Sequence, residues 1–189
     1  MIITLTGPTG VGKTDTSWAL LELASPMVFL DCDWFAARNP FSWKAERDVE
    51  SVYQALSAML SYHIGHGATR FVIPLTLEMS QSYAHNRSYL ERFGLPIFHF
   101  RLACGVGHLR ERVLKRDRIP EQQLRELDVV PAQVQISEAL PDMFIPIDVS
   151  TMDEKTVART VLAVVSTMRQ GAQQGAPADR PLAAPAAGG

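Results

Sequence analysis

Eight residues near the amino terminus have the types and spacing of a phosphate-binding loop, Gly7-Pro8-Thr9-Gly10-Val11-Gly12-Lys13-Thr14. They satisfy G-x-x-x-x-G-K-[ST] at every fixed position, between a predicted strand and a predicted helix. The glycines let backbone N–H groups turn inward around a phosphate, and the helix adds the positive end of its dipole. Lys13 supplies a charge for the β and γ phosphates, and the Thr14 hydroxyl is placed to hold Mg²⁺. We therefore predict that ATP or GTP binds here, with nucleotide contacts from Gly7, Thr9, Gly10, Val11, Gly12, Lys13 and Thr14.

An acidic pair follows the second predicted strand. Asp31 and Asp33 lie at the carboxyl end of that strand, the edge of an open parallel sheet where ligands bind. Alternation along an extended segment points both side chains to the same side. Phosphoryl transfer needs one carboxylate to orient or deprotonate the acceptor hydroxyl and another in the Mg²⁺ shell. The alternative for either residue is a cap on the next helix.

A basic stretch follows the fourth predicted strand, where residues 101–118 contain six of the 18 Lys and Arg residues. Arg112 and Arg116 are four apart and share one face of a predicted helix. Guanidinium groups can close over a γ-phosphate as charge spreads over its oxygens, so both arginines are catalytic candidates. The polar segment that follows is typical of a mobile flap, and we predict a lid over about residues 112–131. Surface pairing with neighbouring acidic residues is the alternative.

The composition limits what else the chain can be. It has 189 residues, 47% hydrophobic and 20% charged, with 18 Lys+Arg against 20 Asp+Glu and a net charge of −2. These values are typical of one globular domain, and they argue against a protein that coats nucleic acid or an anionic membrane. The two cysteines lack the spacing of a zinc site. The start of the chain has no apolar leader segment, so we expect a cytoplasmic protein, monomeric or homodimeric.

Strand-like and helix-like segments alternate, which predicts an α/β fold with a parallel sheet. The expected strands cover residues 2–6, 27–30, 70–75, 97–103 and 144–149. The expected helices cover residues 13–23, 46–63, 81–92, 108–116, a pair within 121–140, and 153–168. Residues 171–189 are 14 Gly, Ala or Pro out of 19, so we predict a folded domain over 1–170 and a flexible tail over 171–189.

The order of these features resembles the small P-loop kinases of the shikimate kinase and nucleoside monophosphate kinase type. In this chain the order is a phosphate loop, D-x-D after the second strand, an arginine-bearing helix and a last strand ending Ile147-Asp148-Val149-Ser150. Within that group, the segments Val72–Leu77, Phe98–Leu102 and Leu109–Arg116 are similar to tunicamycin-resistance-like ATP-binding proteins. The likeness covers residues 1 to about 168.

The resemblance implies a five-stranded parallel sheet with helices on both faces, and ATP with Mg²⁺ as cofactors. The implied reaction is transfer of the γ-phosphate to a small hydroxylated molecule, for example a natural product or antibiotic. Lys13 and Thr14 match the nucleotide-phosphate and magnesium positions, and Asp31 matches the acidic position beside Mg²⁺. Asp33 falls at the substrate-binding aspartate.

The lid and the nucleotide base are also assigned by resemblance. Arg112 or Arg116 falls near the arginines that begin the lid, and the loop from Val149 to Asp153 matches the segment against which such kinases lay adenine. Asp148, directly before this segment, and Ser150, within it, are therefore expected to contact the nucleotide.

The chain departs from the resembled pattern at several positions. Tunicamycin-resistance-like proteins usually have an aromatic residue in the phosphate loop, whereas this loop begins Gly7-Pro8-Thr9-Gly10. They also have D-P-E after the second strand, where this chain has Asp31-Cys32-Asp33. The third strand lacks the usual aspartate, and Glu78 is a candidate substitute. Thr76 and Tyr83 are candidates for acceptor contact. The aromatic residues after Asp33 can stack on an acceptor ring or pack in the core, namely Trp34, Phe35, Phe41 and Trp43.

Two other functions share the phosphate loop. Gly7-Pro8-Thr9-Gly10 also resembles the loop of P-loop isopentenyl transferases, which hold a prenyl diphosphate. A nucleotide-dependent protein that sequesters a ligand is the third possibility. The leading interpretation is an ATP-dependent phosphotransferase.

Overall fold

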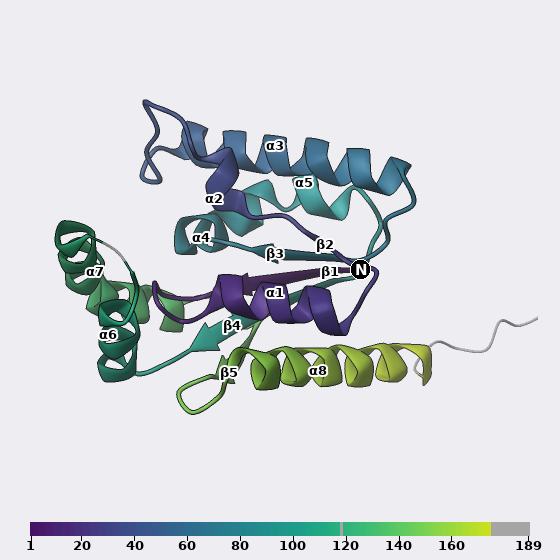
Figure 1. Ribbon diagram of the computed structural model, residues 1–189. Helices are drawn as coiled ribbons and strands as arrows, with labels where there is room; N and C mark the ends of the chain where they lie inside the picture. Colours follow the sequence, from purple (N-terminus) through teal and green to yellow (C-terminus); the bar gives the residue numbers. More distant parts are fainter. Residues whose placement is uncertain (118, 175–189) are drawn as a thin grey trace, which may run out of the picture.

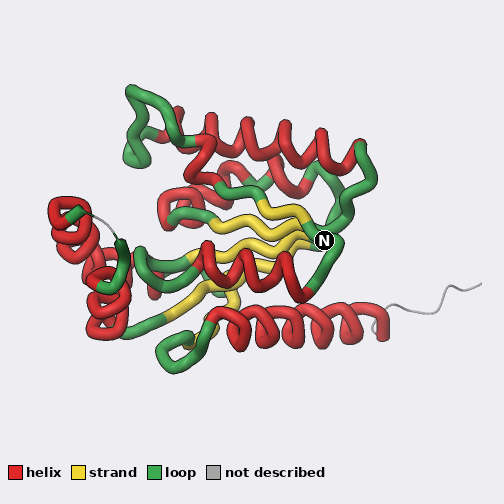
Figure 2. The backbone as a smooth tube through the Cα atoms, viewed as in Figure 1, coloured by secondary structure: helices red, strands yellow, loops and turns green. Residues whose placement is uncertain are grey.

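Five strands form one parallel sheet in the computed structural model of the chain, which describes residues 1–117 and 119–174. The strand order is β2-β3-β1-β4-β5, so β1 is central. Figures 1 and 2 show the strands side by side, with their carboxyl ends toward α6 and α7. The strands are β1 (Ile2–Thr6), β2 (Val28–Phe29), β3 (Phe71–Pro74), β4 (Ile97–Ala103) and β5 (Phe144–Asp148). The predicted five-stranded parallel sheet is confirmed.

Helices cover both faces of this sheet (Figure 1). One face carries α1 (Lys13–Leu23) and α8 (Glu154–Gln174), and the other carries α3 (Glu46–Gly65), α4 (Leu77–Asn86) and α5 (Ser88–Glu91). A short helix, α2 (Cys32–Phe35), follows β2. Beyond the carboxyl ends of the strands lie α6 (Val106–Leu114) and α7 (Pro120–Glu138).

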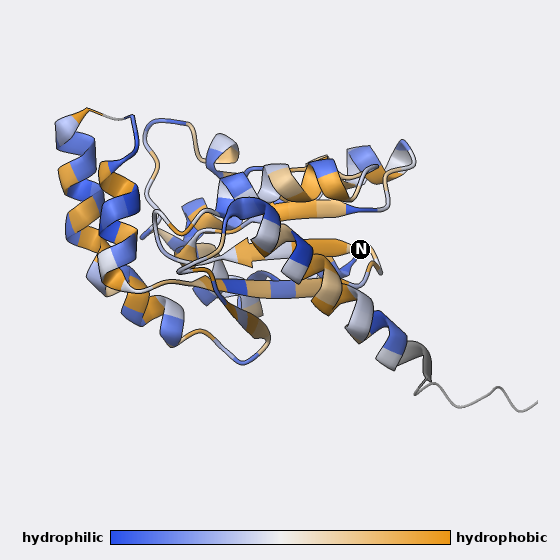
Figure 3. Cartoon of the chain, turned by 60° about the horizontal axis from the view of Figure 1, so that its bottom comes forward, coloured by the Kyte–Doolittle hydropathy of each residue, from blue (hydrophilic) through white to orange (hydrophobic). Residues whose placement is uncertain are grey.

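The strands divide the core into two layers because successive side chains point to opposite faces. Ile3 and Leu5 of β1 pack with α1 and α8, whereas Ile2 packs with α3 and α4. All five residues of β1 are buried, as expected for a strand covered on both faces. In Figure 3 the strands are mostly hydrophobic, whereas the helices carry hydrophobic residues on one side and hydrophilic residues on the other. The phosphate loop that follows β1 is therefore anchored to the centre of the core.

Several predicted boundaries were wrong. The helix expected at 81–92 begins earlier, at Leu77, because the Thr76 hydroxyl caps its N-terminus by accepting from Met79 N–H at 3.3 Å. It is divided into α4 and α5, which join at Arg87. The pair expected within 121–140 is the single helix α7, which begins with Pro120 and contains Pro131. Residues 120–131 of the predicted lid segment thus belong to α7.

The carboxyl-terminal helix is longer than predicted. It runs to Gln174, so the first four residues of the expected tail are helical, and residues 175–189 lie outside the described residues. The helix predicted to end at residue 63 extends to Gly65, where His66 is its C-cap and the His66 ring Nδ1 lies 2.7 Å from the Tyr62 carbonyl oxygen. Over the described ranges, no helix combines the length and apolar character that a bilayer crossing requires.

Candidate active site

The phosphate loop leaves β1 through three glycines with positive φ, at 143° for Gly7, 85° for Gly10 and 96° for Gly12. Side chains are rarely tolerated in such conformations. Packing adds a second constraint, because a Cβ on Gly7 would lie 2.5 Å from the carbonyl oxygen of Leu102 and one on Gly10 would lie 3.1 Å from a methyl of Val113. The glycines therefore let the loop turn sharply while it lies against β4 and α6.

Unpaired backbone donors gather where this loop enters α1. Within the described part of the chain, the N–H groups of Gly10, Gly12, Lys13 and Thr14 donate to no protein acceptor, and Gly12 offers no side-chain cap. Donors of this kind at a helix N-terminus, together with the helix dipole, form an anion site. The loop thus fits a polyphosphate.

Lys13 lies folded over the same loop. Its Nζ donates to the carbonyl oxygens of Gly7 at 2.7 Å and Pro8 at 3.2 Å. Burial lowers the pKa of Lys13 to about 8, and Asp33 opposes this shift while Arg116 adds to it. Neutral carbonyl oxygens hold the ammonium at the loop. A charged phosphate oxygen would accept a stronger hydrogen bond from it than these carbonyls do.

The two aspartates take different positions from those predicted. They do not continue an extended strand, because Asp31 is the N-cap of α2 and its Oδ1 accepts from Asp33 N–H at 3.0 Å. Burial raises the pKa of Asp31, and the hydrogen bond from Asp33 N–H opposes the shift. Asp33 lies in the first turn of α2 and is exposed. The capping alternative thus holds for Asp31, and both carboxylates still face the phosphate loop.

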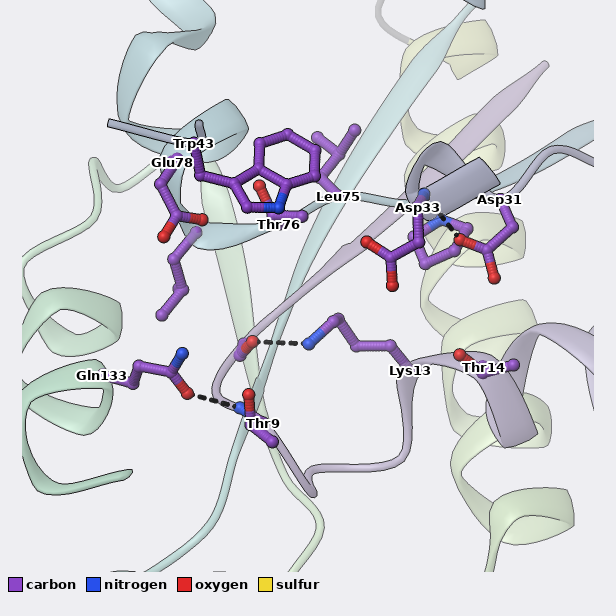
Figure 4. Close-up of a pocket in the computed structure, with 13 residues that line it drawn as sticks. Thr9, Lys13, Thr14, Asp31, Asp33, Trp43, Leu75, Thr76, Glu78 and Gln133 are labelled. Atoms are coloured by element: carbon purple, nitrogen blue, oxygen red, sulfur yellow. Dashed lines mark hydrogen bonds between the residues drawn. The ribbon is translucent and has the colours of Figure 1, made fainter. Parts of the chain in front are cut away.

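One cavity of about 240 Å³ brings the predicted groups together. Its wall includes Gly7, Thr9, Lys13 and Thr14 of the loop and both aspartates of α2. Figure 4 shows Lys13 between the loop and the carboxylates. Parallel strands deliver these segments to the same edge of the sheet, so residues far apart in sequence meet there.

The opposite wall of this cavity contains residues that the sequence placed less clearly. Trp43, from the segment before α3, and Glu78, from the first turn of α4, both line this cavity and are drawn in Figure 4. Thr76 also lines the cavity, while its hydroxyl caps α4. The other acceptor candidate, Tyr83, is buried in the core against His99 and does not line this cavity. Trp34 is exposed, and Phe41 packs edge-on against Trp43 at 4.8 Å.

Gln133 of α7 is a site residue that sequence reasoning missed. Its Oε1 accepts from Thr9 N–H at 2.7 Å, and its side chain lines the cavity. This bond fixes the amide so that its NH₂ group points into the cavity (Figure 4). A polar residue on a long polar helix gives no sequence signal of such a contact.

The two candidate arginines do not share one helix as predicted, because α6 ends at Leu114 and Arg116 lies beyond its C-cap, and their surroundings differ. Arg112 donates to the carbonyl oxygens of Val11 at 3.2 Å and Val149 at 2.8 Å, so it ties the phosphate loop to the loop after β5. Arg116 pairs with Glu126 of α7 at 3.1 Å and lines a wider cleft with Lys13. Arg116 therefore fits a phosphate-closing role, and Arg112 fits a positioning role.

The segment predicted to lie against the nucleotide base borders a cavity, but its two predicted contact residues do not line it. A cavity of about 320 Å³ beside the phosphate loop is lined by Arg112, Met152 and Glu154. The Asp148 carboxylate instead accepts from the Ser150 backbone N–H at 3.0 Å and hydroxyl at 2.6 Å, and these bonds lower its pKa. Neither residue lines the cavities beside the loop. Asp148 and Ser150 thus shape the loop after β5 rather than face this space.

Two residues that line the cavity carry oxygen atoms of the kind that Mg²⁺ prefers as ligands. Thr14 and Asp31 line the same cavity, as predicted, but the described residues contain no cluster of three or more His, Cys, Asp or Glu able to hold a metal. Mg²⁺ commonly takes one or two protein ligands and completes its shell with phosphate oxygens and water. Thr14 and Asp31 match that pattern.

The sheet order, the phosphate loop after β1 and the helices on both faces define the fold of the P-loop small-molecule kinases. Scans against protein-family models and against curated proteins find no match.

Several solved structures of other proteins share this fold. The chain is similar to the Deinococcus radiodurans tunicamycin resistance protein, with TM-score 0.63 and 20% identity over 87% of this chain and 94% of the other. A gluconokinase from Sinorhizobium meliloti 1021 gives 0.62 and 16%, over 92% and 97%. A shikimate kinase from Acinetobacter baumannii in complex with shikimate gives 0.54 and 18%, over 89% and 94%. At these identities the likeness establishes the fold, as the sequence predicted.

Proposed function

We propose that this protein is an ATP-dependent phosphotransferase that moves the γ-phosphate to a hydroxyl of a small molecule. The observation that carries the proposal is the shared cavity, in which Asp33 faces Lys13 and Thr14 of the phosphate loop. An exposed carboxylate beside a phosphate-binding lysine is the arrangement that phosphoryl transfer to a hydroxyl needs.

The phosphate side of the reaction uses charge and position. The free N–H groups at the start of α1 hold the phosphates, and Lys13 exchanges its loop carbonyls for phosphate oxygens. Arg116 reaches the same cleft from the segment between α6 and α7, and it neutralises charge that spreads over the transferred group. Mg²⁺, held by Thr14 and Asp31, would supply further charge neutralisation.

The acceptor side depends on Asp33. Its carboxylate accepts the proton of the acceptor hydroxyl as the oxygen forms a bond to the γ-phosphorus. The bond between that phosphorus and the bridging oxygen of ADP breaks, so the products are ADP and a phosphate ester. Asp33 makes no side-chain hydrogen bond within the described residues, which leaves its carboxylate available for this role.

The cavity size favours a small acceptor. Its volume of about 240 Å³ lies below the about 300–1,000 Å³ of typical drug-sized sites. Three structural neighbours are named as a gluconokinase, a shikimate kinase and a sugar kinase, and one is named as a tunicamycin resistance protein. A small hydroxylated metabolite, natural product or antibiotic is consistent with both observations.

The test is an assay with γ-labelled ATP, Mg²⁺ and a panel of hydroxylated molecules, with labelled product detected by mass. We expect label on at least one acceptor with the native chain and none with Lys13→Ala. A parallel arm supplies labelled prenyl diphosphate, and a third measures acceptor binding without transfer. Prenyl transfer, or tight acceptor binding with no transfer, would replace the kinase proposal with one of the two alternatives.

A further inference from the structure

The charges on the cavity wall bear on which acceptor it takes. Three carboxylates line the cavity, from Asp31, Asp33 and Glu78, against one cation, Lys13, among its described lining residues. In the proposed reaction Lys13 binds the phosphate, and Asp31 belongs to the Mg²⁺ shell. The space left for the acceptor then has Asp33 on one side and Glu78 on the other (Figure 4).

Glu78 is available to a ligand. It is half-buried in the first turn of α4, and the described residues give it no hydrogen bond or ion pair. The N-cap of α4 is already supplied by Thr76, whose hydroxyl accepts from Met79 N–H, so helix capping does not require this carboxylate. A carboxylate that is partly removed from water is stabilised more by a hydrogen bond from a cationic donor than by one from a neutral donor.

Trp43 provides an apolar surface in the same cavity as Glu78. Its indole lines the cavity and contacts the Phe41 ring edge-on. An aromatic side chain and a carboxylate that line one cavity favour a ligand with both a ring surface and a positive charge, through stacking and cation–π attraction.

We propose that the acceptor is a small hydroxylated cyclic amine, with its ammonium group at Glu78, its ring on Trp43 and the reacting hydroxyl at Asp33. Acidic acceptors are disfavoured, because a carboxylate in this cavity would meet Glu78 and Asp33 with only a phosphate-bound lysine to balance it. This inference rests on the proposed kinase function and adds the substrate class.

The experiment compares three matched acceptor classes in the transfer assay: hexoses, 2-amino-2-deoxyhexoses and hexuronic acids. We expect kcat/KM to be highest for the amines and lowest for the acids. Glu78→Gln should lower the ratio of amine to hexose kcat/KM by about 10- to 100-fold, the range for a hydrogen bond to a charged group. The matched control is Glu91→Gln, since Glu91 pairs with Arg87 on the surface of α5 and should leave the ratio unchanged.

Binding separates this inference from the proposed function. Affinity for a non-hydrolysable ATP analogue is measured by calorimetry, and affinity for each acceptor class is then measured in the presence of that analogue. Analogue binding with equal affinity for all three classes, or with preference for acids, overturns the substrate class and leaves the kinase proposal standing. No analogue binding overturns both.

Discussion

The side-chain oxygen of Gln133 accepts a hydrogen bond from the backbone N–H of Thr9 at 2.7 Å, across 124 residues of sequence. This bond joins α7 to the phosphate loop at a position that faces the proposed phosphate site. We therefore expect nucleotide binding and the placement of α7 to be linked through this amide group.

Gln133→Glu tests this link. The carboxylate still accepts from Thr9 N–H but adds a negative charge beside the phosphates, so we expect ATP-analogue affinity to fall about tenfold or more. Gln135→Glu adds the same charge on the exposed face of α7 and should have little effect. Calorimetric titration of both variants makes the measurement, and equal affinities would show that Gln133 does not face the phosphate.

Lys13 should give nucleotide binding a pH dependence. Burial lowers its pKa to about 8, so above that pH the unliganded protein loses the ammonium that phosphate needs. We expect affinity for the ATP analogue to fall as pH rises from 7 to 9.5. Lys13→Arg keeps its charge over this range and should lose that decline. A decline that persists in Lys13→Arg would assign the titration to another group.

The same lysine should destabilise the unliganded protein. At pH 7 it is charged in both folded and unfolded chains, but burial penalises it only in the folded one. Between pH 8 and about 10.5 the unfolded chain binds more protons, so this penalty falls as pH rises. Lys13→Met should therefore raise Tm at pH 7, with a smaller gain at pH 10, while abolishing transfer. Thermal unfolding by circular dichroism measures both, and a lower Tm at pH 7 would contradict the argument.

Substitutions of the two aspartates should have different effects on activity. Asp33→Asn removes the proposed base and should lower transfer by about 10²-fold or more while ATP-analogue affinity stays nearly unchanged. Asp31→Asn keeps an N-cap for α2, because asparagine caps as well as aspartate, but should raise the Mg²⁺ concentration needed for half-maximal rate. Transfer assays with Mg²⁺ titrated decide between them. Unchanged transfer in Asp33→Asn would remove that residue from catalysis.

The two arginines should also differ. Arg112 holds two carbonyl groups, so Arg112→Ala should lower the unfolding free energy by about 1–3 kcal/mol and weaken ATP binding. Arg116 makes one partly exposed ion pair, so Arg116→Ala should change stability by at most about 1 kcal/mol. Its transfer rate should nevertheless fall about 10³-fold. Denaturant unfolding and single-turnover rates test the pair, and the reverse pattern would exchange their roles.

Local patterns predicted most of the fold. The buried strands and the glycine loop are encoded by contiguous residues, so Ile2–Thr6 and Lys13–Leu23 were placed correctly. The boundaries of α4 and α7 were missed because capping by Thr76 and tertiary packing outweighed the local proline and polarity signals.

The site was predictable where it follows from the sheet edge. Asp31 and Asp33 reach the loop because β2 ends there, although a helical turn rather than strand alternation orients them. The contact of Gln133 with Thr9 and the separate environments of the arginines depend on how α6 and α7 pack, which no local pattern encodes.

The central position of β1 gives the two sides of the site different resistance to local opening. Backbone amides of β1 are buried between β3 and β4, so their hydrogen exchange requires near-global unfolding. Helices α6 and α7 lie at the end of the sheet and expose Leu114, Leu124 and Val129 to solvent. Their amides can exchange through smaller openings. The phosphate loop is thus attached at its β1 end to the slowest-exchanging strand, while we expect the segment after α6 that carries Arg116 and the helix α7 that carries Gln133 to open more readily.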